Sequence, residues 1–255
     1  MQRIALLLTA RRHPERLLAC LEECFRQADV LSADGRFSTT VWFCDRGASG
    51  SLSEAVTERF SQVRLVRSEP GPCWSLGLRT AWVEASREDY DFYIWVDAEL
   101  ELAENALFTL LDNSAFLQHR AIVAGSVTDR QGKLRFGGRT RKKHLLRPDP
   151  VIPVPCEVFD GMLVLVPRFV FERLGVLDER YRQGLGDYDY GIRAVKAGIV
   201  RVIAPGILAT TERRPYKPVM RENFLYDRRS VGLPAAVWNA IKMYVQQLFV
   251  KNEQV

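Results

Sequence analysis

The chain has 255 residues, of which 47% are hydrophobic and 26% charged, and this composition excludes a disordered or fibrous protein. Lysines and arginines outnumber acidic residues 36 to 31, and the resulting net charge of +5 suits an anionic ligand or membrane surface. The sequence lacks the dense basic stripe of a nucleic-acid binder. No apolar run approaches the about 20 residues of a membrane-spanning helix, and residues 1–20 show no secretory signal, so we expect a cytoplasmic protein.

The five cysteines predict neither a disulfide framework nor a zinc site, because they are odd in number and include no C-x-x-C pair. Cys20 and Cys24 lie four residues apart on the apolar side of an expected helix. We therefore expect both to be small buried hydrophobes.

Apolar residues alternate between strand and helix periods along the first hundred residues. The run at 4–9 predicts a buried strand, and Pro14 opens a stretch in which Leu17, Cys24 and Ala28 follow helical spacing. Further strands are expected at 39–45, 63–67 and 92–97, and further helices at 52–60 and 76–85. This alternation predicts an α/β fold with a mostly parallel central sheet flanked by helices.

The pattern is less regular after residue 100. We expect helices at 104–111, 169–174 and 187–197, strands at 121–127, 162–166 and 200–204, and a hairpin around 129–133. Residues 138–155 combine basic side chains with four prolines and predict a long irregular loop. Apolar residues at helical spacing from Pro234 onward predict an amphipathic helix. We therefore expect one domain over 1–213 and a C-terminal helical extension over 214–255.

Polar residues follow several of the expected strands, where open parallel sheets bind their ligands. These residues are Thr9, Ala10 and Arg11 at the end of the first strand, Asp45 at the end of the second, Asp97 and Glu99 at the end of the fourth, and Asp160 with Gly161 at the end of a later one. The turn after the first strand reads TARRHPE and contains no G-x-G-x-x-G, and no G-x-x-x-x-G-K-[ST] occurs in the chain. Dinucleotide-binding and P-loop sites are therefore excluded.

Asp97 and Glu99 close the apolar strand FYIWV with one residue between them. Residues i and i+2 of a strand point the same way, so both carboxylates can approach one Mg²⁺ or Mn²⁺ ion that keeps open positions for phosphate oxygens. The alternative is that these acids solvate a turn or cap the next helix.

A second acidic cluster, GDYDYG at 186–191, precedes an amphipathic helix. Asp187 could cap that helix. It could instead accept a proton from an attacking hydroxyl as a general base.

In their order along residues 3–213, these segments resemble the inverting family 2 glycosyltransferases of the GT-A fold. The family's first strand and helix are matched by LLLTARRHPERLLACLEE, its nucleotide-contacting strand and turn by VWFCDRGASGSLSEAV, and the helix after its third strand by GPCWSLGLRTAW. Its metal motif is matched by YIWVDAELEL, its acceptor-side strand and helix by FDGMLVLVPRFVFERLGVLDERY, and its catalytic-base segment by GLGDYDYGIRAVKAG. The last two matches are the most specific.

The resemblance implies a role for each matching residue. It places Thr9, Ala10 and Arg11 in the nucleotide's base pocket, Asp45 on the base, Arg79 near the nucleotide, and Asp97 and Glu99 on the nucleotide's divalent metal. It makes Asp187 the catalytic base, Asp189 a neighbouring acid that orients the acceptor or supports the site, and Asp160 and Gly161 contacts of the sugar or acceptor.

The sequence departs from the family at two metal ligands. Glu99 replaces the second acid of the D-x-D motif, and no histidine follows the last strand, which leaves Glu212 as a weak substitute and Arg213 as a candidate phosphate partner. We expect His13, His119 and His144 to be surface or loop residues.

The implied activity is transfer of a sugar from a nucleoside-diphosphate sugar to a hydroxyl of a glycan or lipid-linked acceptor, with Mg²⁺ or Mn²⁺, as in bacterial polysaccharide or glycoconjugate synthesis. Loop 138–155 is the candidate lid. The C-terminal helix could rest on the inner face of a membrane, join two copies, or pack on the domain, which we favour. Two alternatives are a sugar nucleotidyltransferase and a non-catalytic module that binds anionic glycans through loop 138–155.

Overall fold

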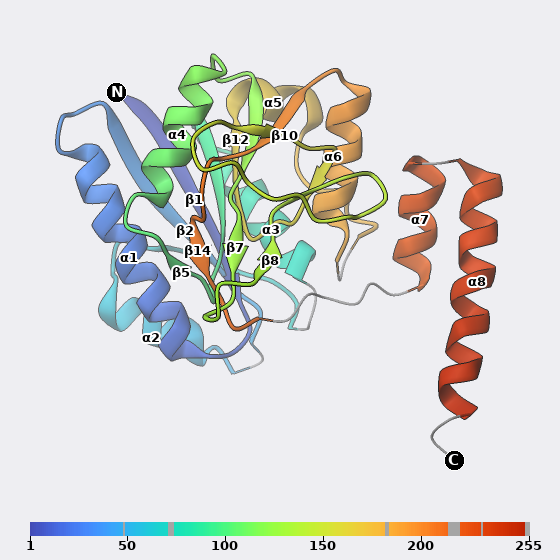
Figure 1. The fold of residues 1–255 in the computed structure, drawn as a ribbon. Coiled ribbons are helices and arrows are strands. Elements are labelled where there is room, and N and C mark those ends of the chain that lie inside the picture. The colour runs from blue at the N-terminus through green and yellow to red at the C-terminus, as the bar shows by residue number, and fades with distance from the viewer. Residues whose placement is uncertain (48, 71–73, 182–183, 214–219, 231, 253–255) are drawn as a thin grey trace.

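A computed structural model describes residues 1–47, 49–70, 74–181, 184–213, 220–230 and 232–252, and its centre is an eight-stranded sheet (Figure 1). The strand order is β10 (Val154–Pro155), β13 (Val200–Ile203), β6 (Ala121–Ala124), β12 (Leu163–Pro167), β4 (Phe92–Asp97), β1 (Gln2–Ala10), β2 (Phe37–Asp45) and β3 (Arg64–Arg67). Only β12 and β10 pair antiparallel with their neighbours in this sheet. The expected mostly parallel sheet is confirmed.

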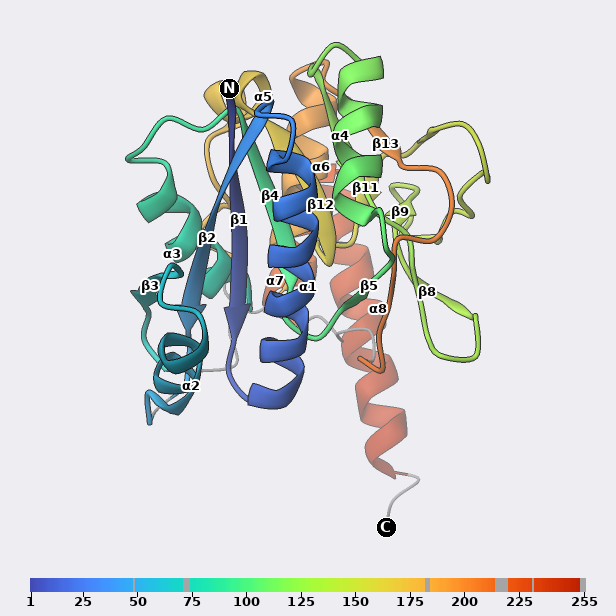
Figure 2. The same cartoon turned by 90° about the vertical axis from the view of Figure 1, so that its left-hand side faces the viewer.

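The sheet is buried on both faces because successive side chains of its strands point in opposite directions. On β1, Ile4, Leu6 and Leu8 pack toward α1 (Pro14–Ser32), α2 (Ser51–Arg59) and α4 (Ala106–Phe116). Ala5 and Leu7 pack toward α3 (Trp74–Ala85), α5 (Arg168–Leu174) and α6 (Gly186–Lys196). Figure 2 shows α1 and α4 in front of the sheet and α5 and α6 behind it. Each fully buried leucine contributes about 1.5–3 kcal/mol, so a one-residue slip of β1 is strongly disfavoured.

An aromatic cluster joins the elements that carry the candidate site. Trp82 of α3 lies 5.2 Å from Trp95 of β4 and 5.5 Å from Tyr190 of α6, measured between ring centroids. Trp95 and Tyr190 are also 5.5 Å apart. Such pairs contribute about 0.5–1.5 kcal/mol each beyond their burial. The cluster therefore fixes the end of β4, which carries Asp97, relative to the start of α6, which carries Asp187.

A second sheet brings the last residues of the α/β body beside the end of β4. It contains β5 (Glu101–Leu102), β14 (Ala209–Thr210), β7 (Val127–Thr128) and β8 (Leu134–Phe136). Its β7–β8 hairpin turns through a hydrogen bond from Asp129 N to Lys133 O at 2.9 Å, as expected. The pairing of β14 with β5 places Arg213 close to Asp97.

The expected irregular loop at 138–155 has short strands at its ends. β9 (Gly138–Arg139) pairs with β11 (Val158–Phe159), and β10 joins the edge of the central sheet. Between β9 and β10 the structure assigns no helix or longer strand.

The described cysteines, Cys20, Cys24, Cys44 and Cys156, are free and buried, which confirms the burial expected of Cys20 and Cys24; Cys73 lies outside the described residues. A hydrogen bond with Cys24, together with burial, raises the pKa of the Cys20 thiol. Cys20 Sγ donates to Asp97 O at 3.6 Å, so this thiol packs α1 against the end of β4.

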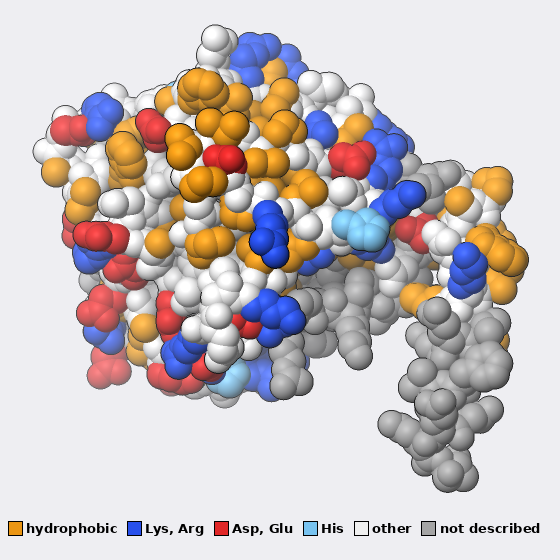
Figure 3. Space-filling model, viewed as in Figure 1, with side chains coloured by type: hydrophobic (Ala, Val, Ile, Leu, Met, Phe, Trp, Pro, Cys, Tyr) orange, Lys and Arg blue, Asp and Glu red, His pale blue; other side chains and the backbone are white. Residues whose placement is uncertain are grey.

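The C-terminal extension forms α7 (Met220–Ser230) and α8 (Leu233–Asn252) beside the α/β body (Figure 1). Ala236 is buried where α8 packs against α7, whereas Val237, Trp238 and Ile241 are exposed. Figure 3 shows hydrophobic side chains on the described surface of this extension. No described helix has the length and hydropathy needed to span a bilayer. Contact of this exposed face with a membrane or with a second copy of the chain stays a prediction. The domain boundary at residue 213 also stays a prediction.

Candidate active site

A cavity of about 240 Å³ lies at the carboxyl ends of β1 and β4, and we refer to it as the strand-end cavity. Thr9 and Asp97 are register partners on these adjacent parallel strands, which is why the two loops that follow meet there. The cavity is lined by Thr9, Ala10, Arg11, Arg12, His13, Arg46, Asp97, Ala98, Glu99 and Arg213. Five of the residues predicted to bind the nucleotide or its metal therefore line one cavity: Thr9, Ala10, Arg11, Asp97 and Glu99.

Asp97 is buried, and both of its carboxylate oxygens are engaged within the chain. Oδ1 accepts from Glu99 N at 3.1 Å, and Oδ2 is paired with Nη1 of Arg213. Glu99 Oε2 is paired with Arg16 Nη1 at 3.1 Å. Each acid of the D-x-E motif is thus neutralised by its own guanidinium.

Glu212, the substitute third ligand, belongs to the same chain of ion pairs and does not complete a metal site. Its carboxylate pairs with Arg16 Nη2 at 2.7 Å and with Arg130 Nη1 at 3.1 Å. Among the residues described, no three histidine, cysteine, aspartate or glutamate side chains converge on one point. Because every candidate carboxylate is held by arginine, the residues present do not fit the Mg²⁺ or Mn²⁺ that the resemblance implies.

Asp45 and Arg79 have partners away from the strand-end cavity lining. The buried Asp45 accepts from Gly47 N at 2.7 Å through Oδ1, and from Ser53 N at 3.0 Å and Ser53 Oγ at 2.7 Å through Oδ2. Arg79 donates from Nε to Leu177 O at 3.0 Å. Neither side chain lines the strand-end cavity, although Asp45 is the register partner of Ala10 on the adjacent strand β2. Their roles stay predictions.

Asp187 is held beside this cavity by the backbone of the next strand. Its Oδ2 accepts from Gly161 N at 2.6 Å, and Met162 O in turn accepts from Asp97 N at 2.7 Å. Asp187 is not among the residues that line the strand-end cavity. It lies at the same edge of the sheet, connected to Asp97 through Gly161 and Met162.

The protein environment makes Asp187 a weaker acid than a free aspartate. Desolvation, reinforced by the negative charge of Asp160, raises the pKa of Asp187 to about 7, against hydrogen bonds from the backbone N–H groups of Gly161 and Tyr188. A general base is most effective when its pKa lies near the operating pH. Asp187 therefore has the acidity that base catalysis near neutral pH requires.

The backbone before Asp187 has an unusual conformation. Leu185, the residue that precedes α6, has φ 56° and ψ 4°, in the left-handed region that leucine rarely adopts. Strain of this kind persists where the surrounding structure imposes it, and it concentrates at functional sites.

Asp160 is buried, and its carboxylate accepts hydrogen bonds from three residues. It accepts from Arg139 Nε at 2.8 Å, from Gly137 N at 3.0 Å and from Tyr188 Oη at 2.8 Å. Arg139 lies in loop 138–155, so its ion pair with Asp160 connects this basic loop to the candidate site. Asp160 supports the Asp187 region through Tyr188.

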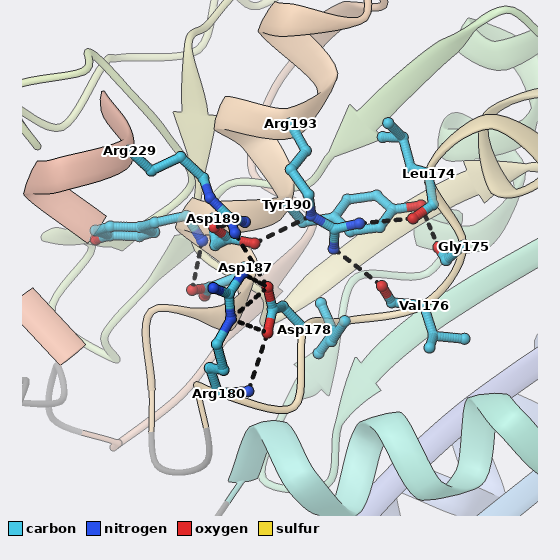
Figure 4. Close-up of polar contacts among 12 residues, drawn as sticks. Leu174, Gly175, Val176, Asp178, Arg180, Asp187, Asp189, Tyr190, Arg193 and Arg229 are labelled. Carbon is cyan, nitrogen blue, oxygen red and sulfur yellow. Dashed lines mark hydrogen bonds and ion pairs between the residues drawn. The ribbon is translucent and has the colours of Figure 1, made fainter. Parts of the chain in front are cut away.

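Asp189 is fully buried between two arginines. Arg193 Nε donates to its Oδ2 at 3.0 Å, and Nη1 of Arg229 pairs with its Oδ1 (Figure 4). Arg229 Nη2 also pairs with Asp178 at 3.2 Å. The Asp189 carboxylate thus faces arginines of α6 and α7, and its role in orienting the acceptor or supporting the site stays a prediction.

Helix α7 also contacts loop 138–155 and the segment before Asp187. Lys143 Nζ donates to Asn223 Oδ1 at 2.9 Å, and Tyr226 Oη donates to Arg141 O at 3.1 Å. Gly184 N donates to Glu222 Oε2 at 2.9 Å. Through these bonds α7 packs against the candidate site.

Two side chains missed by the sequence reasoning contact these groups. A Cβ added to Gly161 would lie 2.4 Å from Trp74 Cη2, which shows that the Trp74 ring covers Gly161 beside Asp187. Arg46 donates from Nε to Thr9 Oγ1 at 2.8 Å within the cavity. Both residues lie in the matched segments VWFCDRGASGSLSEAV and GPCWSLGLRTAW, and that was the only signal available.

The three histidines lie in loops, as expected. His13 precedes α1 and lines the strand-end cavity, so it belongs to the candidate site. His119 is half-buried against Phe92, with 4.9 Å between ring centroids, and His144 is exposed in loop 138–155.

No protein-family model and no curated protein matches the sequence. The structure is similar to that of GalNAc-T7 solved with UDP, GalNAc and Mn²⁺, with TM-score 0.60 and 14% identity over 90% of this chain and 47% of that one. It is also similar to TarS 1–349 of S. aureus, with TM-score 0.59 and 9% identity over 90% of this chain and 65% of that one.

The chain has the GT-A glycosyltransferase fold. It spans about half to two thirds of the length of these GT-A structures. At this level of identity the likeness extends to the fold, and the chemistry is argued from the residues of the site.

Proposed function

We propose that the protein is an inverting glycosyltransferase that moves a sugar from a nucleoside-diphosphate sugar to a hydroxyl group of a glycan or lipid-linked acceptor. The observation that carries this proposal is Asp187: a carboxylate with a pKa of about 7 lies beside the strand-end cavity at the ligand-binding edge of a GT-A sheet. Assembly of a bacterial polysaccharide or another glycoconjugate is the setting that the family resemblance suggests.

In the proposed reaction, Asp187 accepts the proton of the acceptor hydroxyl as its oxygen attacks the anomeric carbon of the sugar. The new carbon–oxygen bond forms on the face opposite the nucleoside diphosphate, whose bond to the anomeric carbon breaks. One displacement inverts the configuration at that carbon. The negative charge that leaves with the diphosphate needs cationic partners, and four arginines line the strand-end cavity: Arg11, Arg12, Arg46 and Arg213.

Positioning supplies the rest of the proposed catalysis. Gly161 N fixes the Asp187 carboxylate, and the ring of Trp74 over Gly161 provides an apolar surface beside it. Alignment of bound reactants can contribute about 7–11 kcal/mol to lowering a barrier. Exclusion of water matters equally, because water competes with the acceptor hydroxyl.

The two alternative functions make different demands on the chain. A sugar nucleotidyltransferase would need a glycine-rich phosphate loop after β1, and TARRHPERL contains no glycine. A non-catalytic glycan-binding module would use the basic side chains of loop 138–155, but Arg139 pairs with Asp160 and Lys143 with Asn223.

The proposed function is tested by measuring turnover of UDP-, GDP- and dTDP-sugars by the wild-type protein and by Asp187→Asn, with nucleotide binding measured by calorimetry. Loss of a general base lowers turnover by about 10²–10⁴-fold, while binding of the nucleoside diphosphate should be retained. Equal turnover by both proteins would refute Asp187 as the base. Nucleoside-diphosphate binding by neither protein would favour the non-catalytic module.

A further inference from the structure

The positions expected to hold a metal ion are occupied by guanidinium groups. Arg213 pairs with Asp97, whose side chain is 1% exposed, and Arg16 bridges Glu99 and Glu212 at 3.1 and 2.7 Å. A divalent cation at Asp97 would have to displace Arg213 and then lie beside it. Two cations so close in a site of low dielectric repel strongly, so arginine and metal are alternatives at this position.

The remaining cations of the strand-end cavity are suited to phosphate. Arg11 and Arg12 are exposed at its mouth, and neither guanidinium has a hydrogen bond or ion pair with any residue the structure describes. Arg46 is buried in the cavity, 7% exposed. Four arginines against two carboxylates leave the lining positively charged without any metal. Guanidinium groups bind phosphate oxygens through paired N–H donors in a fixed fork.

We propose that this protein binds the diphosphate of its nucleotide without a divalent cation, with Arg213, oriented by Asp97, in the place and role of the metal ion. Arg11 and Arg12 contact the same diphosphate from the loop after β1. This inference rests on the proposed function, because it takes a nucleoside diphosphate as the ligand of the strand-end cavity. Asp97 then serves to position an arginine and is a positioning residue.

The test is calorimetric binding of UDP, GDP, dTDP and inorganic pyrophosphate to the full chain, in excess EDTA and in MnCl₂. Pyrophosphate is included because its binding does not depend on the nucleotide base. We expect affinities in EDTA and in MnCl₂ to agree within about twofold. Arg213→Gln should lower affinity in EDTA by about tenfold to a hundredfold, the usual effect of removing a hydrogen bond between charged groups.

Two further variants separate this inference from general electrostatics and from misfolding. Arg130→Gln removes the same charge from an exposed side chain that pairs with Glu101 and Glu212 outside the cavity lining, and its affinity should equal that of the wild type. Asp97→Asn should bind the diphosphate equally in EDTA and in MnCl₂, more weakly than the wild type but more tightly than Arg213→Gln, because Arg213 stays and only the carboxylate that orients it is lost. A lower affinity of Asp97→Asn in MnCl₂ alone would identify Asp97 as a metal ligand and overturn the inference.

The outcomes distinguish the inference from the function on which it rests. Binding that requires Mn²⁺ and disappears in EDTA would overturn the inference and leave the glycosyltransferase proposal intact. Unchanged affinity of a folded Arg213→Gln would also overturn it. Failure of all four probes to bind in both buffers would overturn the proposed function as well.

Discussion

Asp187 gives a prediction that can be checked without knowing the substrate. Its pKa is raised to about 7 in the folded chain, first by desolvation and then by the charge of Asp160. An unfolded aspartate titrates at about 3.9. The folded state therefore holds this proton more tightly, so stability declines as pH rises from about 4 to about 7 and changes no further above that.

The magnitude follows from the part of the shift that lies in an accessible pH range. When the pH rises from about 5 to about 8, the folded state loses the stabilisation that corresponds to roughly two units of this pKa difference. Each unit is worth about 1.4 kcal/mol. Solvent reaches the partly exposed side chain of Asp187 and reduces this to about 2 kcal/mol. Asp187→Asn keeps the acceptor for Gly161 N and removes the titration. The wild type should therefore lose about 2 kcal/mol relative to this variant across that range.

Urea denaturation of both proteins at several pH values measures this difference. Asp178→Asn is the control, because its hydrogen bond with Arg180 lowers the pKa of Asp178. The stability that Asp178 contributes is present above about pH 4 and is lost only below it, so this variant should differ from the wild type by a constant amount from about pH 5 to 8. A wild-type minus Asp187→Asn difference that is constant or rises with pH would refute the argument.

Two other substitutions test the packing around the site. Arg229→Met leaves the buried Asp189 with one of its two arginines, and we expect the free energy of unfolding in urea to fall by about 2–4 kcal/mol. An unchanged free energy would show that the ion pair between Arg229 of α7 and Asp189 contributes nothing to stability. Gly161→Ala places a Cβ 2.4 Å from Trp74 Cη2, and we expect a loss of about 1–3 kcal/mol in denaturation together with lower turnover. Adding Trp74→Leu should recover the stability but not the turnover, and a stable, active Gly161→Ala would contradict the placement of this ring.

Periodicity in the sequence was enough to predict the α/β class and the mostly parallel sheet, whereas the GT-A fold was expected only from the family resemblance. The alternation of Ala5, Leu6, Leu7 and Leu8 between two buried faces requires a strand covered on both sides, and the structure has helices there. The C-terminal helices were predicted only in part, because α7 is polar and carries no clear apolar stripe to identify it.

The residues that line the strand-end cavity were predictable where they lie at the carboxyl end of a strand, as Thr9 and Asp97 do. Their partners were not, because ion pairs form between segments far apart in the chain: Asp97 with Arg213, and Asp189 with Arg229. Spacing within a motif indicates that two carboxylates can share a cation. It does not indicate that an arginine more than a hundred residues later occupies that position.

The central claim is that one nucleoside diphosphate binds with its phosphates among the arginines of the strand-end cavity and its sugar toward Asp187. A crystal structure of the protein with a bound nucleoside diphosphate tests this most directly. We expect phosphate oxygens within about 2.7–3.2 Å of Arg213 or Arg11, and the Asp187 carboxylate facing the space beyond the terminal phosphate. A nucleotide bound elsewhere on the molecule, or an Asp187 carboxylate separated from that space by the chain, would contradict the account.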